Sequence, residues 1–348
     1  MLKIAKERLN ELYAKINESM CLYLPIKAAG EVNYAVWGEG KEVSLETLKT
    51  VKSPKSAFFP QTENMMKFKT EEGNLQVIDV REKLSAKIEE RPFVMFGVKA
   101  CDYKAIEVLD KVFLADPVDT YYQNRREHGV IISTACSRPV ETCFCNTFDI
   151  DMTKPEGDVR SYKTDDAYYF ESLTEKGKKL LEKAQSILEE SGNEAVEEQI
   201  AKTKEIAKKL PFHDLSKDAF GKDKTDEFFN SPAWDSLSES CLGCGTCTFV
   251  CPTCQCYDIK DFNTGHGVKR FRCWDSCMYS DFTKMSAGQP RLSQKERFRQ
   301  RFMHKLVYYP TNNDGLFSCV GCGRCVAKCP ISMNIVKVMK TLTEKEGK

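Results

Sequence analysis

CLGCGTCTFVCP, residues 241–252, contains four cysteines at the spacing C-x2-C-x2-C-x3-C and ends in proline. The pattern recurs as CVGCGRCVAKCP, residues 319–330. Each run supplies three thiolates to one [4Fe-4S] cluster through a tight turn, and where two runs occur the fourth cysteine ligates the other cluster. We therefore predict two [4Fe-4S] clusters, one held by Cys241, Cys244, Cys247 and Cys329, the other by Cys319, Cys322, Cys325 and Cys251.

The glycines within both runs support this interpretation. Gly243, Gly245, Gly321 and Gly323 let the backbone approach a cluster closely and direct N–H groups at its sulfurs. Structural zinc is the alternative. Zinc sites, however, usually pair two C-x2-C units across a spacer and do not need three cysteines in one turn. The doubled run therefore favours iron–sulfur clusters over zinc.

Composition and charge limit the other interpretations. The chain has 348 residues and 17 cysteines, and 12 of these cysteines fall between Cys241 and Cys329 in tight local groups. Such grouping favours metal ligation over disulfides, and the charged N-terminus lacks the apolar core of an export signal. No uncharged run approaches the roughly 18–20 apolar residues of a membrane helix, and 52 basic residues nearly balance 51 acidic ones. We expect a cytoplasmic protein with no membrane and no nucleic-acid partner.

The hydrophobic pattern predicts two domains of the α+β/α/β class. Two unbroken apolar runs, FVMFGV (93–98) and GVIIST (129–134), are typical of strands buried on both faces, and an amphipathic helix lies between them. This βαβ rhythm predicts a mainly parallel sheet in an α/β domain over residues 1–225. Further predicted elements are a helix within residues 1–20, strands at 21–26, 32–37 and 75–80, and a solvated helical hairpin near 174–210.

The second predicted domain covers residues 231–340 and contains both cysteine runs. Residues 252–318 separate the runs, and the segment SQKERFRQRFMHKLVYY within them has helical apolar spacing at Phe298, Phe302, Leu306 and Tyr309. We therefore expect an α-helical ferredoxin domain with two [4Fe-4S] clusters. The insertion is also locally basic, which indicates compensation of cluster charge or a docking face for an acidic subunit, with a nucleic-acid patch as the alternative.

Four cysteines of the first domain form a further candidate site. Cys101 and Cys136 each follow one of the two buried strands, so in a parallel sheet both lie at the carboxyl edge, where ligands collect. Cys143 and Cys145 follow in a loop that can fold back on this edge. A third [4Fe-4S] cluster is our hypothesis here, with Asp102 as a substitute for one thiolate. The alternative is that Cys101 and Cys136 are small buried hydrophobes.

The remaining motifs are less informative. Cys254, Cys256, Cys273 and Cys277 match no metal-binding spacing, although together they could make another site, and Cys21 is expected in the core. There is no G-x-G-x-x-G after a strand and no G-x-x-x-x-G-K-[ST], so neither phosphate-binding loop is supported. The four histidines are scattered, and we see no nucleophile–base arrangement, so we assign no catalytic residue to this chain.

Seven segments together resemble one family. They are FGVKACDYKAIEVLD (96–110), YYQNRRE (121–127), CFCNT (143–147), CPTCQC (251–256), RCWDSC (272–277), RFMHKLVYY (301–309) and CVGCGRC (319–325). Over residues 75–335 the chain is similar to the iron–sulfur β subunit of cytosolic sulfhydrogenases (hydrogenase/sulfur reductase) and to the related A subunit of anaerobic sulfite reductase. Besides the eight ferredoxin cysteines, the resemblance implies functional roles for Cys101, Cys136, Cys143, Cys145, Cys254, Cys256 and Cys277, but not for Cys273.

Members of that family transfer electrons between a flavin subunit that uses NAD(P)H and a catalytic subunit that carries a nickel–iron or sirohaem centre. The resemblance therefore implies an electron relay in an anaerobic oxidoreductase complex, with FAD and NAD(P)H expected on a partner subunit. One alternative is an iron–sulfur enzyme that binds substrate or flavin at the carboxyl edge of the N-terminal sheet, with Cys101, Cys136, Cys143 and Cys145 lining the pocket. Another alternative is a zinc-stabilised interaction module.

Overall fold

The largest element is an eight-stranded mixed sheet in the order β10-β1-β9-β8-β7-β6-β2-β3. A computed structural model describes residues 1–47, 49–71 and 74–344. The central strands run parallel: β2 (Cys21–Ala28), β6 (Phe93–Val98), β7 (Gly129–Thr134) and β8 (Val159–Lys163). The outer strands are antiparallel: β1 (Leu2–Ala5), β3 (Glu31–Val36), β9 (Ala167–Ser172) and β10 (Glu189–Glu190). The parallel centre confirms the predicted βαβ unit, and every residue of β6 and β7 is buried.

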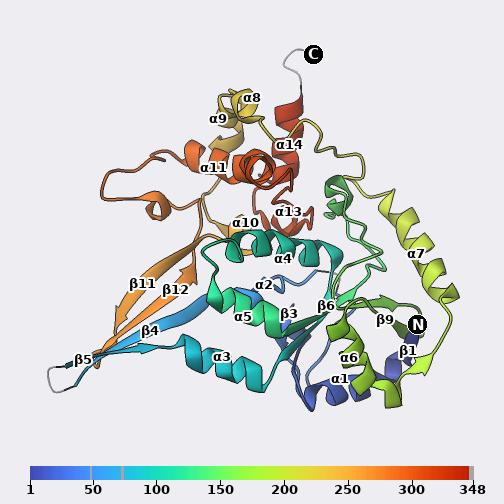
Figure 1. Cartoon of the computed structure of the whole chain (residues 1–348). Coiled ribbons are helices and arrows are strands. Elements are labelled where there is room, and N and C mark those ends of the chain that lie inside the picture. Colours follow the sequence, from blue (N-terminus) through green and yellow to red (C-terminus); the bar gives the residue numbers. More distant parts are fainter. Residues whose placement is uncertain (48, 72–73, 345–348) are drawn as a thin grey trace.

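Helices cover both faces of this sheet (Figure 1). One face packs against α1 (Leu9–Asn17) and α6 (Glu175–Lys183), whose apolar side chains join the same core as those of the strands. The opposite face packs against α4 (Ala100–Phe113), α5 (Thr120–His128) and α7 (Glu194–Ala207). The remaining helical elements of this domain are η1 (Lys6–Arg8), α2 (Lys55–Phe58), α3 (Arg81–Glu90), η2 (Cys145–Phe148) and η3 (Gln185–Ile187).

Two N-terminal-domain elements differ from expectation. The first residues form β1 before the helix starts, because β1 pairs with β9 and buries Ile4. Both helices of the segment 174–210 are present, but they do not form a hairpin. Helix α6 buries Leu180 and Leu181 against one sheet face, whereas α7 buries Val196 against the other, and β10 lies between them in sequence.

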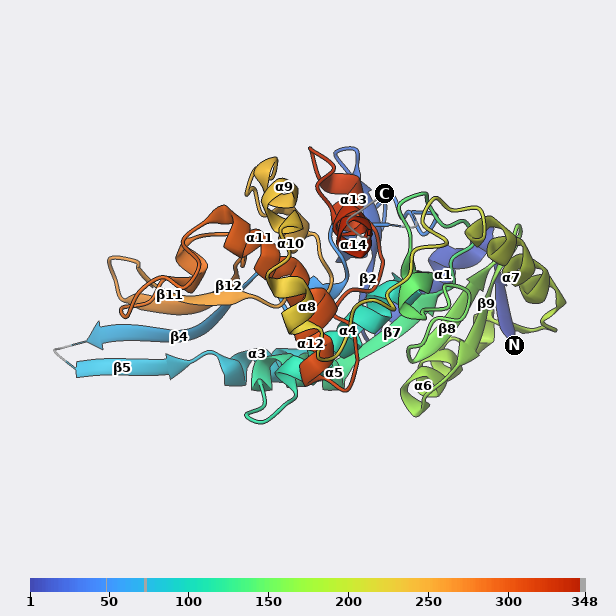
Figure 2. The same cartoon turned by 90° about the horizontal axis from the view of Figure 1, so that it is seen from above.

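A second, four-stranded antiparallel sheet combines segments from distant parts of the chain. Its order is β11-β12-β4-β5, with β4 (Thr62–Glu71), β5 (Asn74–Asp79), β11 (Tyr257–Asn263) and β12 (Val268–Trp274). The predicted strand at 75–80 is thus present as β5, but it belongs to this sheet and not to the large one. Figure 2 shows the sheet projecting from the body of the molecule. The insertion between the cysteine runs therefore begins with a β-hairpin and only later becomes helical.

The C-terminal helices pack above α4 (Figure 1). They are α8 (Thr225–Phe229), α9 (Ala233–Glu239), α10 (Thr246–Phe249), η4 (Asp281–Thr283), α11 (Gln294–Met303), the π-helical η5 (His304–Tyr308), α12 (Tyr309–Asn312), α13 (Arg324–Lys328) and α14 (Ile335–Thr343). The four apolar side chains predicted on one side of the segment 293–309 are all buried, as expected: Phe298, Phe302, Leu306 and Tyr309. In the part of the chain that is described, no helix combines the length and apolarity needed to cross a bilayer.

Candidate iron–sulfur sites

The four cysteines predicted for the first cluster line one pocket. Cys241, Cys244, Cys247 and Cys329 share this pocket with apolar side chains and with Arg301. Cys244 and Cys247 flank Gly245, which caps α10 in the left-handed conformation at φ 72°. A Cβ at Gly245 would lie 2.5 Å from the Tyr279 hydroxyl. The close approach at this glycine is therefore to a tyrosine of the neighbouring loop.

The four cysteines predicted for the second cluster also lie together. Cys319 and Cys322 precede α13, and Cys325 lies within it. Burial, together with the nearby Cys322 and Cys251 thiols, raises the pKa of the Cys325 thiol to about 12. Cys251 has the same effect on Cys319 and Cys322. The fourth cysteine of the first run thus faces the three cysteines of the second run.

The four N-terminal cysteines gather at the carboxyl edge of β6 and β7. Cys101 is at the start of α4, Cys136 follows β7, and Cys143 and Cys145 come from the loop that leads into η2. All four pack in one small cluster with Met152 and neighbouring apolar side chains. Burial raises the pKa of Cys145, and the adjacent Cys136 and Cys143 thiols raise it further. The structure therefore brings together every cysteine of this hypothesis.

The loop that carries Cys143 and Cys145 lies directly against the second cysteine run. The N–H of Phe144 donates to the carbonyl oxygen of Gly321 at 2.9 Å. A Cβ at Gly321 would lie 2.3 Å from the Phe144 carbonyl oxygen, and one at Gly323 would lie 1.9 Å from that of Thr142. Both glycines have positive φ, 57° and 72°. They are needed for contact between the two halves of the chain, a role that the motif alone did not indicate.

Asp102 has a different partner from the one considered in the sequence. Its two carboxylate oxygens accept hydrogen bonds from the Arg324 guanidinium at 2.5 and 2.8 Å. Both side chains are buried, at 2% and 3% exposure. This geometry uses the carboxylate for an ion pair, so the structure gives no support for Asp102 as a substitute ligand.

Cys254, Cys256 and Cys277 form a fourth group beside the second site. The Cys277 thiol lowers the pKa of Cys256, and the Cys254 thiol lowers the pKa of Cys251, so the thiols of each pair lie close together. The N–H of Asp275 donates to the Cys256 carbonyl at 2.9 Å, which closes the base of the β11–β12 hairpin and brings the two loops together. The thiol of Cys273 is separate, and the charges that act on it are those of Lys260, Asp258 and Asp275.

Three buried cations without a carboxylate partner lie among the C-terminal cysteines, and a fourth, Lys99, is buried beside Cys101 and Cys136. Burial alone lowers the pKa of Arg301 and of Lys305, but neighbouring thiolates raise both above their ordinary values: Cys247, Cys325, Cys254 and Cys251 for Arg301, and Cys251, Cys254 and Cys319 for Lys305. Lys55 Nζ donates to the carbonyls of Cys251 and Cys254 at 3.1 and 2.9 Å and lies over the Trp274 ring. Within the described residues none of the three cations pairs with a carboxylate.

This donor set fits iron–sulfur clusters. Buried cations without carboxylate partners are costly unless another anion lies beside them, and thiolate-ligated clusters supply negative charge at these positions. Among the residues that the structure describes, no three His, Cys, Asp or Glu side chains surround one point closely enough to hold a single metal ion. A [4Fe-4S] cluster takes one cysteine at each of four iron atoms, so its ligands are spaced more widely than those of one ion.

The most important residues beyond the predicted ligands are these cations and the pair formed by Asp102 and Arg324. Arg301 and Lys305 belong to the basic insertion noted in the sequence. The only signal that distinguishes them is their place beside Phe302 and Leu306 in an apolar helical pattern. Lys55 begins α2, far in sequence from both runs, and no sequence pattern connects it to them.

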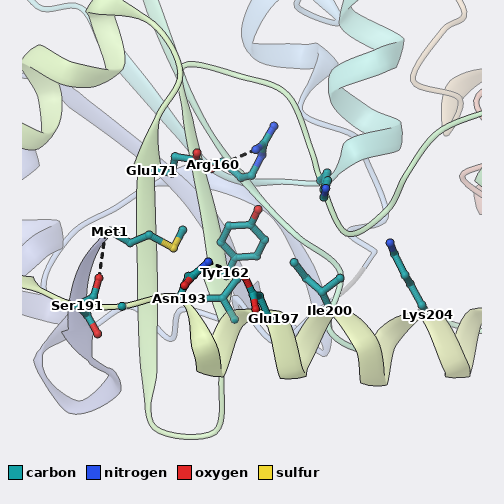
Figure 3. Close-up of a pocket in the computed structure, with 12 residues that line it drawn as sticks. Met1, Arg160, Tyr162, Glu171, Ser191, Asn193, Glu197, Ile200 and Lys204 are labelled. Atoms are coloured by element: carbon teal, nitrogen blue, oxygen red, sulfur yellow. Dashed lines mark hydrogen bonds and ion pairs between the residues drawn. The ribbon is translucent and has the colours of Figure 1, made fainter.

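A separate surface hollow lies between β8, β9 and α7 (Figure 3). Figure 3 shows the Arg160 side chain next to Glu171, with which it forms an ion pair of 3.1 Å. Tyr162, Glu197 and Lys204 also line the hollow, and none of its lining residues is a cysteine. It therefore contributes no thiolate to the candidate sites.

Comparison with known proteins places these sites in a family. Residues 240–333 match the model of the 4Fe-4S dicluster domain. The chain is 30% identical over 347 residues to sulfhydrogenase 2 subunit beta of Pyrococcus furiosus, and the match covers 98% of each protein. No solved structure matches the chain. Since the similarity extends over nearly the whole length of both proteins, the chain belongs to the family of iron–sulfur sulfhydrogenase beta subunits.

Proposed function

We propose that this chain is the electron-transfer subunit of a cytoplasmic sulfhydrogenase-type complex. It relays single electrons between a partner subunit with FAD and NAD(P)H and a catalytic subunit of the hydrogenase, sulfur reductase or sulfite reductase type. The family membership supports the class of complex, and the arrangement of the cysteines supports the relay. No substrate-converting chemistry is assigned to the chain itself.

The main support for the proposal is that the three cysteine groups lie next to one another in the interior of the protein. In the N-terminal group, Cys101 and Cys145 lie close enough to Cys322 for its charge to raise the pKa of each, in addition to the larger effect of burial. In the second group, Cys325 is near Cys247 of the first group. Each group therefore has the next one as its neighbour, which is the arrangement that a one-electron relay requires.

Each [4Fe-4S] cluster, when bound, accepts and releases one electron, at a potential set by charge, hydrogen bonds and exposure. The chain's own residues supply these influences. Arg301, Lys305 and Lys55 place positive charge beside the thiolates, and the buried surroundings of Cys322 exclude water. At the end of this series of cysteine groups that is formed by the first ferredoxin-type group, Cys244 is exposed. Electrons could therefore pass to a partner near this residue.

The proposal includes a third cluster at Cys101, Cys136, Cys143 and Cys145. It also treats residues 231–340 as a helical two-cluster domain in which the β11–β12 hairpin is an insertion. The N-terminal α/β domain, residues 1–225, would then hold the outermost cluster and contribute β4 and β5 to the shared sheet.

The test is anaerobic purification of the full chain, alone and with its co-purifying subunits, followed by iron and sulfide analysis. Three clusters correspond to about 12 iron atoms per chain. Cys136→Ser should reduce iron by about 4 atoms and leave the two ferredoxin-type signals in electron paramagnetic resonance. Cys273→Ser is the matched control and should change neither. NAD(P)H should reduce the clusters only with the partner subunits present, and reduction or sulfur-compound turnover by the chain alone would contradict the relay.

The alternative of a substrate or flavin site at the carboxyl edge of the large sheet has less support. That edge is in contact with the second cysteine run, where Phe144 bonds to Gly321 and Asp102 bonds to Arg324. No specific observation favours a substrate there.

A further inference from the structure

Arg301 has a position that distinguishes it from the other arginines of its helix. Its side chain extends from α11 into the pocket of the first cysteine group, and the residue is only 3% exposed. The guanidinium carbon lies 4.2 Å from the centroid of the Phe302 ring. Among the described residues, its Nε is buried without a hydrogen-bond partner. The charge is thus removed from water with no protein anion to pair with it.

Both ferredoxin-type groups face this one guanidinium. Cys247 of the first group and Cys319 and Cys325 of the second pack against the same apolar cluster as Phe298 and Phe302, which lie on the helix that carries Arg301. The thiols of Cys247, Cys325 and Cys251 also act electrostatically on the Arg301 guanidinium. A charge in a buried environment acts strongly on its neighbours because the effective dielectric constant is much lower than that of water. Arginine stays protonated in proteins. One fixed positive charge therefore lies between the two groups at any pH at which the protein is folded.

The other buried cations do not share this position. Lys305 Nζ donates to Thr253 Oγ1 at 2.9 Å and to the Ser318 carbonyl at 3.2 Å. Arg324 is neutralised by Asp102. Lys55 Nζ donates to the carbonyls of Cys251 and Cys254. Of these four described cations, Arg301 is the one that lines the pocket of the first group and has no hydrogen-bond acceptor in the protein.

We propose that Arg301 is a shared positioning residue that sets the reduction potentials of the two ferredoxin-type clusters together. An electron added to either cluster increases the negative charge beside the same guanidinium, so the reduced state of both is stabilised and no bond or proton moves. The two potentials are thereby raised in common, so the driving force for electron transfer between the clusters is unchanged. This inference rests on the proposed function, because it requires both clusters to be present.

The experiment compares Arg301→Gln, Arg301→Met and Arg301→Lys with the wild-type full chain, purified anaerobically. Iron content is measured first, and the midpoint potentials of the two clusters are then followed by electron paramagnetic resonance during a redox titration. Arg299→Gln is the matched control, since Arg299 is on the same helix but donates to the Phe229 carbonyl and stacks on the Phe229 ring. The titration reports potentials, which a purely structural role of Arg301 would not change in concert.

Removal of the charge should disfavour reduction of each cluster about tenfold, which corresponds to a shift of about 59 mV to lower potential for one electron. Arg301→Lys should restore most of this loss, and Arg299→Gln should not shift either cluster. Unchanged potentials, or a shift of one cluster only, would overturn the shared role while leaving the relay intact. Loss of iron from Arg301→Gln and Arg301→Met, but not from Arg301→Lys, would also support a requirement for positive charge at this position. Loss of iron from all three variants would overturn that requirement. Wild-type protein without iron would instead contradict the proposed function.

Discussion

Asp102 and Arg324, 222 residues apart in sequence, form a buried bidentate ion pair with oxygen–nitrogen distances of 2.5 and 2.8 Å. Asp102 is next to Cys101, and Arg324 is next to Cys325. The remaining donors of Arg324 bind Thr50, through its carbonyl oxygen at 3.0 Å and its hydroxyl at 3.3 Å. The pair therefore fixes the N-terminal cysteine group against the second ferredoxin-type group.

Asp102→Asn should destabilise the folded chain by about 3–5 kcal/mol, because it leaves the Arg324 charge buried without its anion. The measurement is the urea midpoint of the cluster-loaded chain under anaerobic conditions. Glu171→Gln is a suitable control, since it breaks the partly exposed pair with Arg160 and should change the midpoint far less. A midpoint equal to that of the wild type would show that the ion pair does not hold the two groups together.

Gly323→Ala should displace the loop that carries Cys143 and Cys145. The new Cβ would lie 1.9 Å from the Thr142 carbonyl oxygen, in addition to the strain of φ +72°. We expect loss of about 4 iron atoms from the N-terminal site. Gly315→Ala separates the two effects, because Gly315 also has positive φ but nothing lies within 4 Å of its Cβ position. That variant should cost only the backbone strain, about 1 kcal/mol, and should retain all its iron. Equal iron in both variants would contradict the packing argument.

The local patterns of the sequence are sufficient for much of the large sheet. Uninterrupted apolar runs predict β6 and β7, and apolar spacing predicts α4. In each case the residues that become buried form a pattern within the element's own sequence. The second sheet could not be predicted in this way. It depends on pairing of β4 with β12, and these strands are almost 200 residues apart. Their alternation is weak, since the sheet projects into solvent and leaves Leu75 and Phe262 exposed.

For the cysteine groups too, features set by neighbouring residues could be predicted, and features set by distant residues could not. Spacing within each run predicts which thiols converge, and the structure brings each predicted set together. The charges that accompany them are non-local. Lys55 comes from α2, and Asp102 from α4, and each meets a cysteine run only after the chain has folded. A residue type that is usually exposed gives no sequence signal when its partner is distant.

Glu63→Gln should weaken the attachment of the four-stranded sheet to the body. Glu63 is 5% exposed and pairs with Arg125 at 2.5 Å and with Arg272 at 2.6 Å. Loss of its charge leaves two arginines with reduced compensation, so we expect destabilisation of about 3–5 kcal/mol, measured by urea unfolding. Asp261→Asn removes the exposed partner of Arg270 in the same sheet and should leave the midpoint unchanged. Similar midpoints for the two variants would contradict this role for Glu63.

His304 should make the folded chain sensitive to mild acid. Burial, together with the positive charges of Lys305 and Arg291, lowers its pKa to about 4 from an ordinary value of 6.5. As the pH falls below 6.5 the unfolded state binds the proton and the folded state does not, so stability is complete above this pH and decreases toward pH 4. Between pH 7 and 5 the loss should be about 2 kcal/mol. His304→Phe should lose correspondingly less over this range in anaerobic urea unfolding, whereas the exposed His266→Phe should follow the wild type. Parallel losses in all three proteins would show that His304 is not the group responsible.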